Sequence, residues 1–188
     1  MTDKLVIALA QLNPTVGKIG ANLEKLRDTR KKAAEEGADL ILTSELYTCG
    51  YPPEDLVRKP QFISSLRSAV EAFASETSDG GPAVLLGTPW VESNRLHNSL
   101  VLIEGGAITT ARHKYDLPNY GVFDEKRVFD PGPMPGPISF KDVRIGVPIC
   151  EDIWTPEVVE CITETGGEII LVPNGCLLYT SPSPRDDR

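Results

Sequence analysis

Apolar and polar residues alternate along the chain in a way that predicts strands and helices in succession. Residues 5–10 form a short apolar run between polar neighbours, which is typical of a buried strand. From residue 22 to residue 36 apolar side chains recur at helical spacing, and Gly37 ends that helix. Residues 38–43 predict a second buried strand. Strand, helix and strand in this order form a βαβ unit, which indicates an α/β fold.

The same succession continues through the rest of the chain. A loop rich in glycine and proline at residues 50–53 precedes a helix with an apolar face of Phe62, Leu66, Val70 and Phe73. Further strands are predicted at residues 83–87, 99–103, 107–112, 143–149 and 169–172, with a long loop at 117–137. Gly105 and Gly106 predict a hairpin between two of these strands. Thr155 and Pro156 predict the N-cap and first turn of another helix.

The end of the chain breaks this pattern. Residues 176–188 contain two Ser-Pro pairs, end in charged side chains and show no amphipathic period. We interpret them as a non-native or disordered tail, with an ordinary flexible terminus as the alternative. Residues 1–175 are then the folded part. Because an α/β sheet should not stop just after a strand, we expect the natural chain to be longer.

Composition and charge exclude several classes of protein. In 188 residues, 19 basic and 27 acidic side chains leave a net charge of −8, which argues against a nucleic-acid partner. The apolar runs are far shorter than the roughly 18 residues of a membrane-spanning helix, and the N-terminus lacks the features of a signal peptide. Four widely spaced cysteines favour a reduced environment. We therefore expect a single-domain cytoplasmic protein without membrane partners.

Three reactive side chains follow predicted strands, where ligands gather in open α/β sheets. They are Glu45, Lys114 and Cys150. Together they supply a base for a thiol, a thiol to attack a carbonyl carbon, and an ammonium to offset the oxyanion. Each also has a plainer interpretation, as a cap or surface carboxylate, a solvated loop charge and a core cysteine respectively. Their joint placement favours nucleophilic catalysis.

Other conspicuous residues are interpreted as structural. Packing roles are expected for Cys49, Cys161, Trp90 and Trp154, with Cys161 in the core. His97 and His113 are too few and too scattered for a metal site, and nothing places either in a Ser-His-Asp triad. The sequence contains no glycine-rich motif for nucleotide phosphates. No metal or cofactor is therefore expected on this chain.

The segments around the three reactive side chains resemble the Glu-Lys-Cys triad of the nitrilase superfamily. The triad residues stand in the runs 44–46, 113–118 and 148–154. Within the superfamily, residues 114–127 and the Cys-Glu-Asp-x-Trp run that begins at Cys150 are similar to the glutamine-hydrolysing domain of the glutamine-dependent NAD synthetase family. The resemblance covers residues 4–175 and implies an αββα sandwich of the nitrilase type, incomplete at its C-terminus.

The resemblance also implies a mechanism. Glu45 would deprotonate Cys150, and the thiolate would attack the side-chain amide of glutamine. Lys114 and the backbone N–H of Glu151 would stabilise the oxyanion. Ammonia would leave, and Glu45 would then activate the water that releases glutamate.

Two further residues match positions of the family. Glu125 would orient Lys114, and a plain loop charge is its alternative. Tyr120 would contact the substrate, and simple packing is its alternative.

Partners outside this chain follow from the same resemblance. In the family, ammonia passes to a synthetase domain that uses ATP and Mg²⁺ to amidate deamido-NAD, and superfamily members are commonly homo-oligomers. We expect glutamine as the substrate of this chain, and the synthetase domain with its cofactors to be missing from it.

The sequence departs from the family after Gly175. Asn174 and Gly175 fit the asparagine and small residue of the family, but Cys176 and Leu177 stand where the family has a substrate-contacting serine and a proline. Two alternatives stay open. One is a free-standing amidase of the superfamily that acts on another small amide or a carbamoyl compound, and the other is an inactive fragment or binding module.

Overall fold

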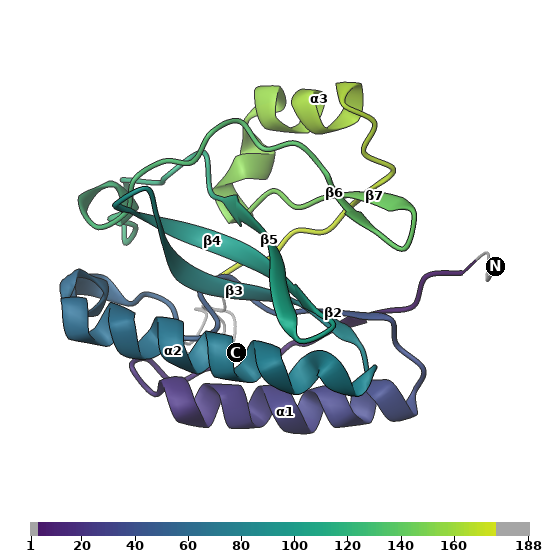
Figure 1. The fold of residues 1–188 in the computed structure, drawn as a ribbon. Helices are drawn as coiled ribbons and strands as arrows, with labels where there is room; N and C mark the ends of the chain where they lie inside the picture. Colours follow the sequence, from purple (N-terminus) through teal and green to yellow (C-terminus); the bar gives the residue numbers. More distant parts are fainter. Residues whose placement is uncertain (1–3, 176–188) are drawn as a thin grey trace, which may run out of the picture.

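The computed structural model describes residues 4–175 (Figure 1). The strands are β1 (Ile7–Leu9), β2 (Leu40–Leu42), β3 (Ala83–Glu92), β4 (Arg95–Glu104), β5 (Ala107–His113), β6 (Ile138–Phe140), β7 (Val143–Gly146) and β8 (Ile169–Ile170). The α-helices are α1 (Ile19–Glu35), α2 (Pro60–Glu76) and α3 (Pro156–Glu164). Short 3-10 helices are η1 (Glu54–Arg58), η2 (Thr77–Asp79), η3 (Glu125–Arg127) and η4 (Cys150–Trp154).

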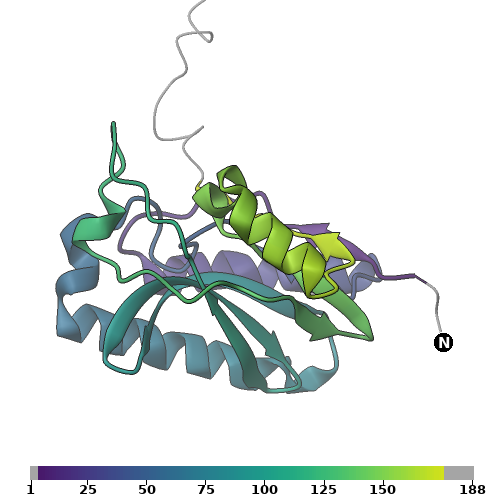
Figure 2. The same ribbon diagram turned by 90° about the horizontal axis from the view of Figure 1, so that it is seen from above.

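Two sheets are stacked between two layers of helix. The larger sheet has the order β1-β2-β3-β4-β5, parallel from β1 to β3 and antiparallel from β3 to β5. The smaller sheet has the order β6-β7-β8. α1 and α2 lie along one face of the larger sheet, while the smaller sheet and α3 lie on its other side (Figure 1), nearest the viewer in Figure 2. The predicted αββα sandwich is confirmed.

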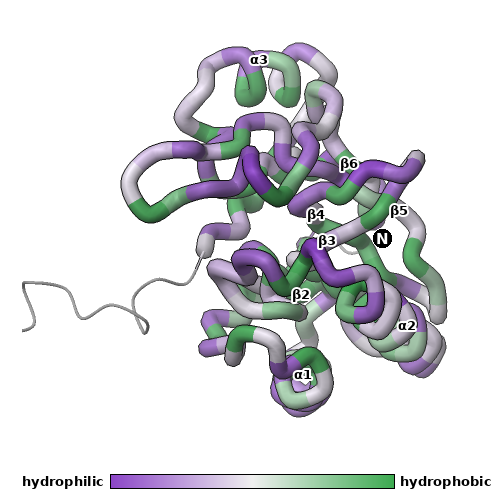
Figure 3. The backbone as a smooth tube through the Cα atoms, turned by 90° about the vertical axis from the view of Figure 1, so that its left-hand side faces the viewer, coloured by the Kyte–Doolittle hydropathy of each residue, from purple (hydrophilic) through white to green (hydrophobic). Residues whose placement is uncertain are grey.

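The alternation of side chains along each strand divides the core into two layers. Ile41 and Val84 belong to the cluster beneath α1 and α2, whereas Leu40 and Leu85 belong to the cluster between the two sheets. Both faces of β2 and β3 are thus buried, which is why they appear as continuous apolar runs in the sequence. Figure 3 shows these hydrophobic strand segments in the interior, between the layers.

The β3–β4 hairpin is longer than the sequence pattern predicts. β3 and β4 pair over nine positions, from Val84 with Ile103 to Glu92 with Arg95, whereas the apolar pattern indicated only residues 83–87 and 99–103. Ser93 and Asn94 make the two-residue turn with φ of 49° and 62°, the positive values that such hairpins use. Ser-Asn is a weaker turn signal than Asn-Gly, so the sequence pattern did not reveal this extension.

Two predictions around the last helix need correction. The strand expected at residues 143–149 ends at Gly146, because Pro148 cannot donate a hydrogen bond to a sheet. Cys150 therefore begins η4 and does not end a strand. Pro156 begins α3 as predicted, but the Thr155 side chain caps no helical N–H and donates instead to the Asp116 carboxylate.

Other expectations concern the C-terminal residues, membrane spans and the domain boundary. Residues 176–188, including Cys176 and the predicted tail, lie outside the described residues. Within residues 4–175, no helix combines the length and apolar character needed to cross a membrane. The predicted domain boundary at residue 175 stays a prediction.

Candidate active site

Glu45 lies just beyond β2, on a tight bend against β3. The Gly87 N–H donates to Thr43 Oγ1 at 2.9 Å, and the Gly87 carbonyl accepts the Thr48 N–H at 3.1 Å. A Cβ at Gly87 would lie 2.2 Å from the Ser44 carbonyl oxygen, so the close approach requires glycine. The bend buries Glu45, whose exposed fraction is 1%.

Lys114 follows β5 and is completely buried between two carboxylates. Its Nζ donates to Glu45 Oε1 at 2.7 Å and to Glu125 Oε1 at 2.9 Å. Burial opposes a charge on Lys114, but the two carboxylates outweigh it and raise the pKa of the ammonium. Burial, and then the charge of Glu45, raise the pKa of Glu125. The structure thus brings together three of the residues singled out from the sequence.

Two residues not singled out from the sequence complete this network. Asn98 Nδ2 donates to Glu45 Oε1 at 2.8 Å and to Glu125 Oε2 at 3.1 Å. Tyr51 Oη donates to Glu125 Oε1 at 3.0 Å. Among residues 4–175, neither Glu45 Oε2 nor Asn98 Oδ1 has a hydrogen-bond partner, although both atoms are buried. No sequence signal relates Asn98 to Glu45, because only the β3–β4 hairpin carries it there.

Cys150 begins η4 with a backbone φ of 49°, a conformation that non-glycine residues rarely adopt. Its N–H donates to the Pro173 carbonyl at 3.0 Å, and the Glu45 N–H donates to the Asn174 carbonyl at 3.1 Å. The segment after β8 therefore ties the two loops together. Burial, and then the charge of Glu45, raise the pKa of the Cys150 thiol to about 12. The resting thiol is protonated near neutral pH, so nucleophilic attack needs a base.

Asp152 links the loop of Cys150 to the loop of Lys114. One carboxylate oxygen accepts the N–H groups of Tyr115 and Asp116 at 3.0 and 2.7 Å, and the other accepts the Ile149 N–H at 2.9 Å. Burial outweighs these bonds and raises the pKa of Asp152 to about 6. This buried aspartate was also not singled out, since its role depends on a contact between distant loops.

Tyr120 lies at the surface, and the half-buried Glu151 is its hydrogen-bond partner. The Tyr120 ring is 58% exposed, and its Oη donates to the Glu151 carboxylate at 2.8 Å. This hydrogen bond raises the pKa of Tyr120. Tyr120 is exposed and Glu151 is half-buried, so the pair lies outside the core. Glu151 directly follows Cys150 in the sequence.

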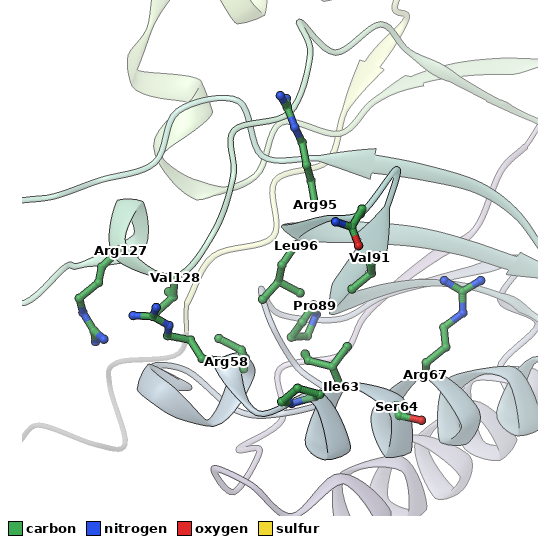
Figure 4. Close-up of a pocket in the computed structure, with 13 residues that line it drawn as sticks. Arg58, Ile63, Ser64, Arg67, Pro89, Val91, Arg95, Leu96, Arg127 and Val128 are labelled. Atoms are coloured by element: carbon green, nitrogen blue, oxygen red, sulfur yellow. The ribbon is translucent and has the colours of Figure 1, made fainter.

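Several cavities lie outside the Glu45–Lys114 network. One, of about 640 Å³, lies between η1, α2 and the β3–β4 hairpin (Figure 4). Four arginines line it, namely Arg58, Arg67, Arg95 and Arg127. Arg67 and Arg127 are already paired with carboxylates of the same chain. Another cavity, of about 310 Å³, lies between the ends of β1 and β2 and residues 172–175, beside Ser44.

The carbon-nitrogen hydrolase family model matches residues 6–186. The chain belongs to the carbon-nitrogen hydrolase family. The resemblance to the nitrilase superfamily is therefore confirmed. The match extends past residue 175 into residues whose structure is not described.

Individual relatives of this carbon-nitrogen hydrolase are similar over most of its length. The glutamine-dependent NAD(+) synthetase of Rhodobacter capsulatus is 41% identical over 93% of this chain, which spans 32% of that protein. The structure of the glutamine-dependent NAD+ synthetase from Acinetobacter baumannii superposes with a TM-score of 0.85 at 33% identity, covering 90% of this chain and 32% of the other. The chain thus spans about a third of the length of these relatives.

A carbon-nitrogen hydrolase of another kind is also similar. An amidase from Nesterenkonia sp. AN1, whose structure shows acrylamide added at the active site cysteine, superposes with a TM-score of 0.78. It is 28% identical, and the match covers 91% of this chain and 67% of the amidase.

Several residues of this carbon-nitrogen hydrolase lie where the sequence did not place them. Cys161 in α3 is only half-buried, and Trp154 at the end of η4 is 78% exposed. His97 and His113 are not scattered, since their rings stack at 4.2 Å across β4 and β5. Cys49 and Trp90 are buried, as expected.

The histidines also take part in an unexpected arrangement. Ser99 Oγ lies 2.7 Å from His113 Nδ1, and His113 Nε2 lies 2.9 Å from Glu92 Oε2. Ser99 is 1% exposed within β4, which closes this serine to substrates. Within residues 4–175, no three His, Cys, Asp or Glu side chains are grouped so that they could hold a metal ion.

Proposed function

We propose that this chain is the glutamine-hydrolysing part of a glutamine-dependent NAD synthetase. The observation that carries the proposal is the buried Lys114 ammonium held by Glu45 and Glu125 at 2.7 and 2.9 Å, beside loops that also position a cysteine. Among the superposed structures, the Acinetobacter baumannii synthetase has a TM-score of 0.85 at 33% identity and the amidase 0.78 at 28%, which supports glutamine over another small amide. A free-standing amidase is therefore the weaker alternative.

The first chemical step is a proton transfer from the thiol to Glu45. Glu45 Oε2 has no hydrogen-bond partner in the described chain, so it is the oxygen available to take the Cys150 proton. The thiolate then attacks the side-chain amide carbon of glutamine. Lys114 and the Glu151 N–H stabilise the oxyanion of the tetrahedral intermediate.

The second half of the reaction restores the enzyme. Glu45 gives its proton to the departing nitrogen, so that ammonia leaves and a glutamyl thioester remains on Cys150. Glu45 next takes a proton from water, whose oxygen attacks the thioester. The thiol leaves with that proton, and the net reaction converts glutamine and water into glutamate and ammonia.

Tyr120 and Glu151 form the rim of the proposed glutamine site. Their hydroxyl and carboxylate, joined at 2.8 Å, would contact the polar end of an amino acid. We expect Tyr120→Phe to raise KM for glutamine and to leave the melting temperature unchanged, because the ring is 58% exposed. A changed kcat at constant KM would contradict a binding role.

The remaining partners belong to the part of the relatives that this chain does not span. ATP, Mg²⁺ and deamido-NAD would act there, and ammonia would pass to that part. We also propose that the protein forms a homo-oligomer and that residues 1–175 form one folded unit.

Glutamate release by the purified chain tests the proposed function. Cys150→Ala should abolish the release, whereas Cys161→Ala, which changes a half-buried cysteine elsewhere on the chain, should leave it unchanged. Propionamide serves as a second substrate. Faster turnover of propionamide than of glutamine would favour the amidase, and turnover of neither would favour the inactive fragment.

A further inference from the structure

We propose that Asn98 is a positioning residue that selects Glu45 Oε2 as the catalytic base. As a statement about catalysis, the proposal rests on the proposed function. As a statement about how Cys150 loses its proton, it can be tested without glutamine.

The hydrogen bonds of Glu45 are divided unequally between its two oxygens. Oε1 accepts Lys114 Nζ at 2.7 Å and Asn98 Nδ2 at 2.8 Å. Oε2 accepts none from the described chain, and it lies 3.3 Å from the position of a Cβ at Gly175. Two donors stabilise negative charge on Oε1, so the basic lone pairs are those of Oε2.

The side-chain amide of Asn98 donates hydrogen bonds to both carboxylates, as Lys114 does. One N–H reaches Glu45 Oε1 and the other reaches Glu125 Oε2 at 3.1 Å, while Lys114 bridges the same pair through Glu125 Oε1. With only the lysine bridge, the Glu45 carboxylate could rotate and exchange its oxygens. Asn98 prevents that exchange, and because the amide is neutral it adds no charge to a buried site.

The backbone of Asn98 makes a hydrogen bond that does not involve its side chain. Its carbonyl accepts the Lys114 N–H at 2.8 Å, which anchors Lys114 to β4. A side-chain substitution leaves this bond in place. The effect of the amide on Glu45 can therefore be separated from the placement of Lys114.

The test compares two substitutions with opposite pH behaviour. Asn98→Leu removes both donors at every pH. Asn98→Asp places a third carboxyl beside Glu45 and Glu125, which repels them when ionised but donates one hydrogen bond when protonated. We expect the Leu variant to be impaired at all pH values and the Asp variant to recover as the pH falls.

The measurement is the alkylation rate of Cys150 by iodoacetamide in the purified 188-residue chain, followed by mass spectrometry of its peptide. At about pH 8, both variants should react roughly tenfold or more slowly than the original chain, the effect of a lost hydrogen bond to a charged group. At about pH 5.5, the rate relative to the original chain should recover for Asn98→Asp only. Asn94→Asp, which makes the same change at an exposed turn position, is the control and should not alter the rate.

Thermal unfolding shows whether each variant is folded, and a milder variant covers the case in which Asn98→Leu is not. Asn98→Ser retains one small donor and should give an intermediate rate, even if the Leu variant does not fold. Original rates in folded variants would overturn the proposal, as would equal slowing of the Leu and Asp variants at both pH values. If the original chain fails to hydrolyse glutamine while Asn98 still controls alkylation, the proposed function fails and this inference stands.

Discussion

Replacing Lys114 with methionine tests the charge balance of the buried network. Lys114→Met keeps a side chain of similar length but removes the ammonium that pairs with Glu45 and Glu125 at 2.7 and 2.9 Å. All three side chains are nearly inaccessible, with exposed fractions of 0%, 1% and 4%. Breaking a buried pair leaves an uncompensated charge, which costs roughly 3–5 kcal/mol of unfolding free energy.

The loss should depend on pH in a definite direction. Burial and the charge of Glu45 already raise the pKa of Glu125, and removal of the ammonium raises it further. The folded variant then binds more protons than the unfolded chain, so its stability falls as the pH rises. The difference from the original chain should therefore be smaller at about pH 5 than at about pH 8.

Urea unfolding at the two pH values measures this difference. Lys141→Met is the matched control, because Lys141 pairs with Asp39 while its own side chain is 58% exposed. Such a surface pair contributes about 0–1 kcal/mol. A loss for Lys114→Met no larger than that of the control, or one that shrinks as the pH rises, would refute the reasoning.

Three other predictions concern the nucleophile, a buried acid and a bend. If the proposed function holds, Cys150→Ala in the longer chain that carries the proposed synthetase part should abolish glutamine-dependent synthesis and retain ammonia-dependent synthesis; loss of both rates would contradict the division of labour. The pKa of Asp152 is raised from 3.8 to about 6, so its contribution to stability falls as the pH rises through that window. Asp152→Asn should remove this part of the pH slope in urea unfolding, and an unchanged slope would count against it. Gly87→Ala would place a Cβ 2.2 Å from the Ser44 oxygen and should destabilise the chain by about 1–3 kcal/mol, whereas Gly20→Ala, in open space on α1, should not destabilise it. Equal melting temperatures for these two variants would show that the bend tolerates a side chain.

Local pattern was informative where one element buries its own apolar face. The helix predicted at residues 22–36 and the strands beside it correspond to α1, β1 and β2, because their periodicity reflects burial in the two core layers. The pattern failed where a partner strand decides the structure. Residues 88–96 belong to the β3–β4 hairpin through pairing across the Ser93–Asn94 turn, and they carry no long apolar run.

In the candidate site, too, the sequence predicted which residues take part but not which atoms are in contact. Glu45, Lys114 and Cys150 were identified from motif resemblance and from their positions after strands, and Glu125 from its match to the family. Which atoms meet depends on segments more than 50 residues apart, as for Asn98 in β4 and Glu45 after β2.

The sequence by itself determined the α/β class through its periodicity and the residue types needed for thiol chemistry through short motifs, while the layered sandwich followed from the resemblance to the nitrilase superfamily. Only the tertiary structure decided that Asn98 bridges two carboxylates, that Asp152 joins two loops and that Trp154 is exposed. The physical reason is that hydrogen bonding and burial in a folded chain depend on distances between residues remote in sequence. No local pattern encodes those distances.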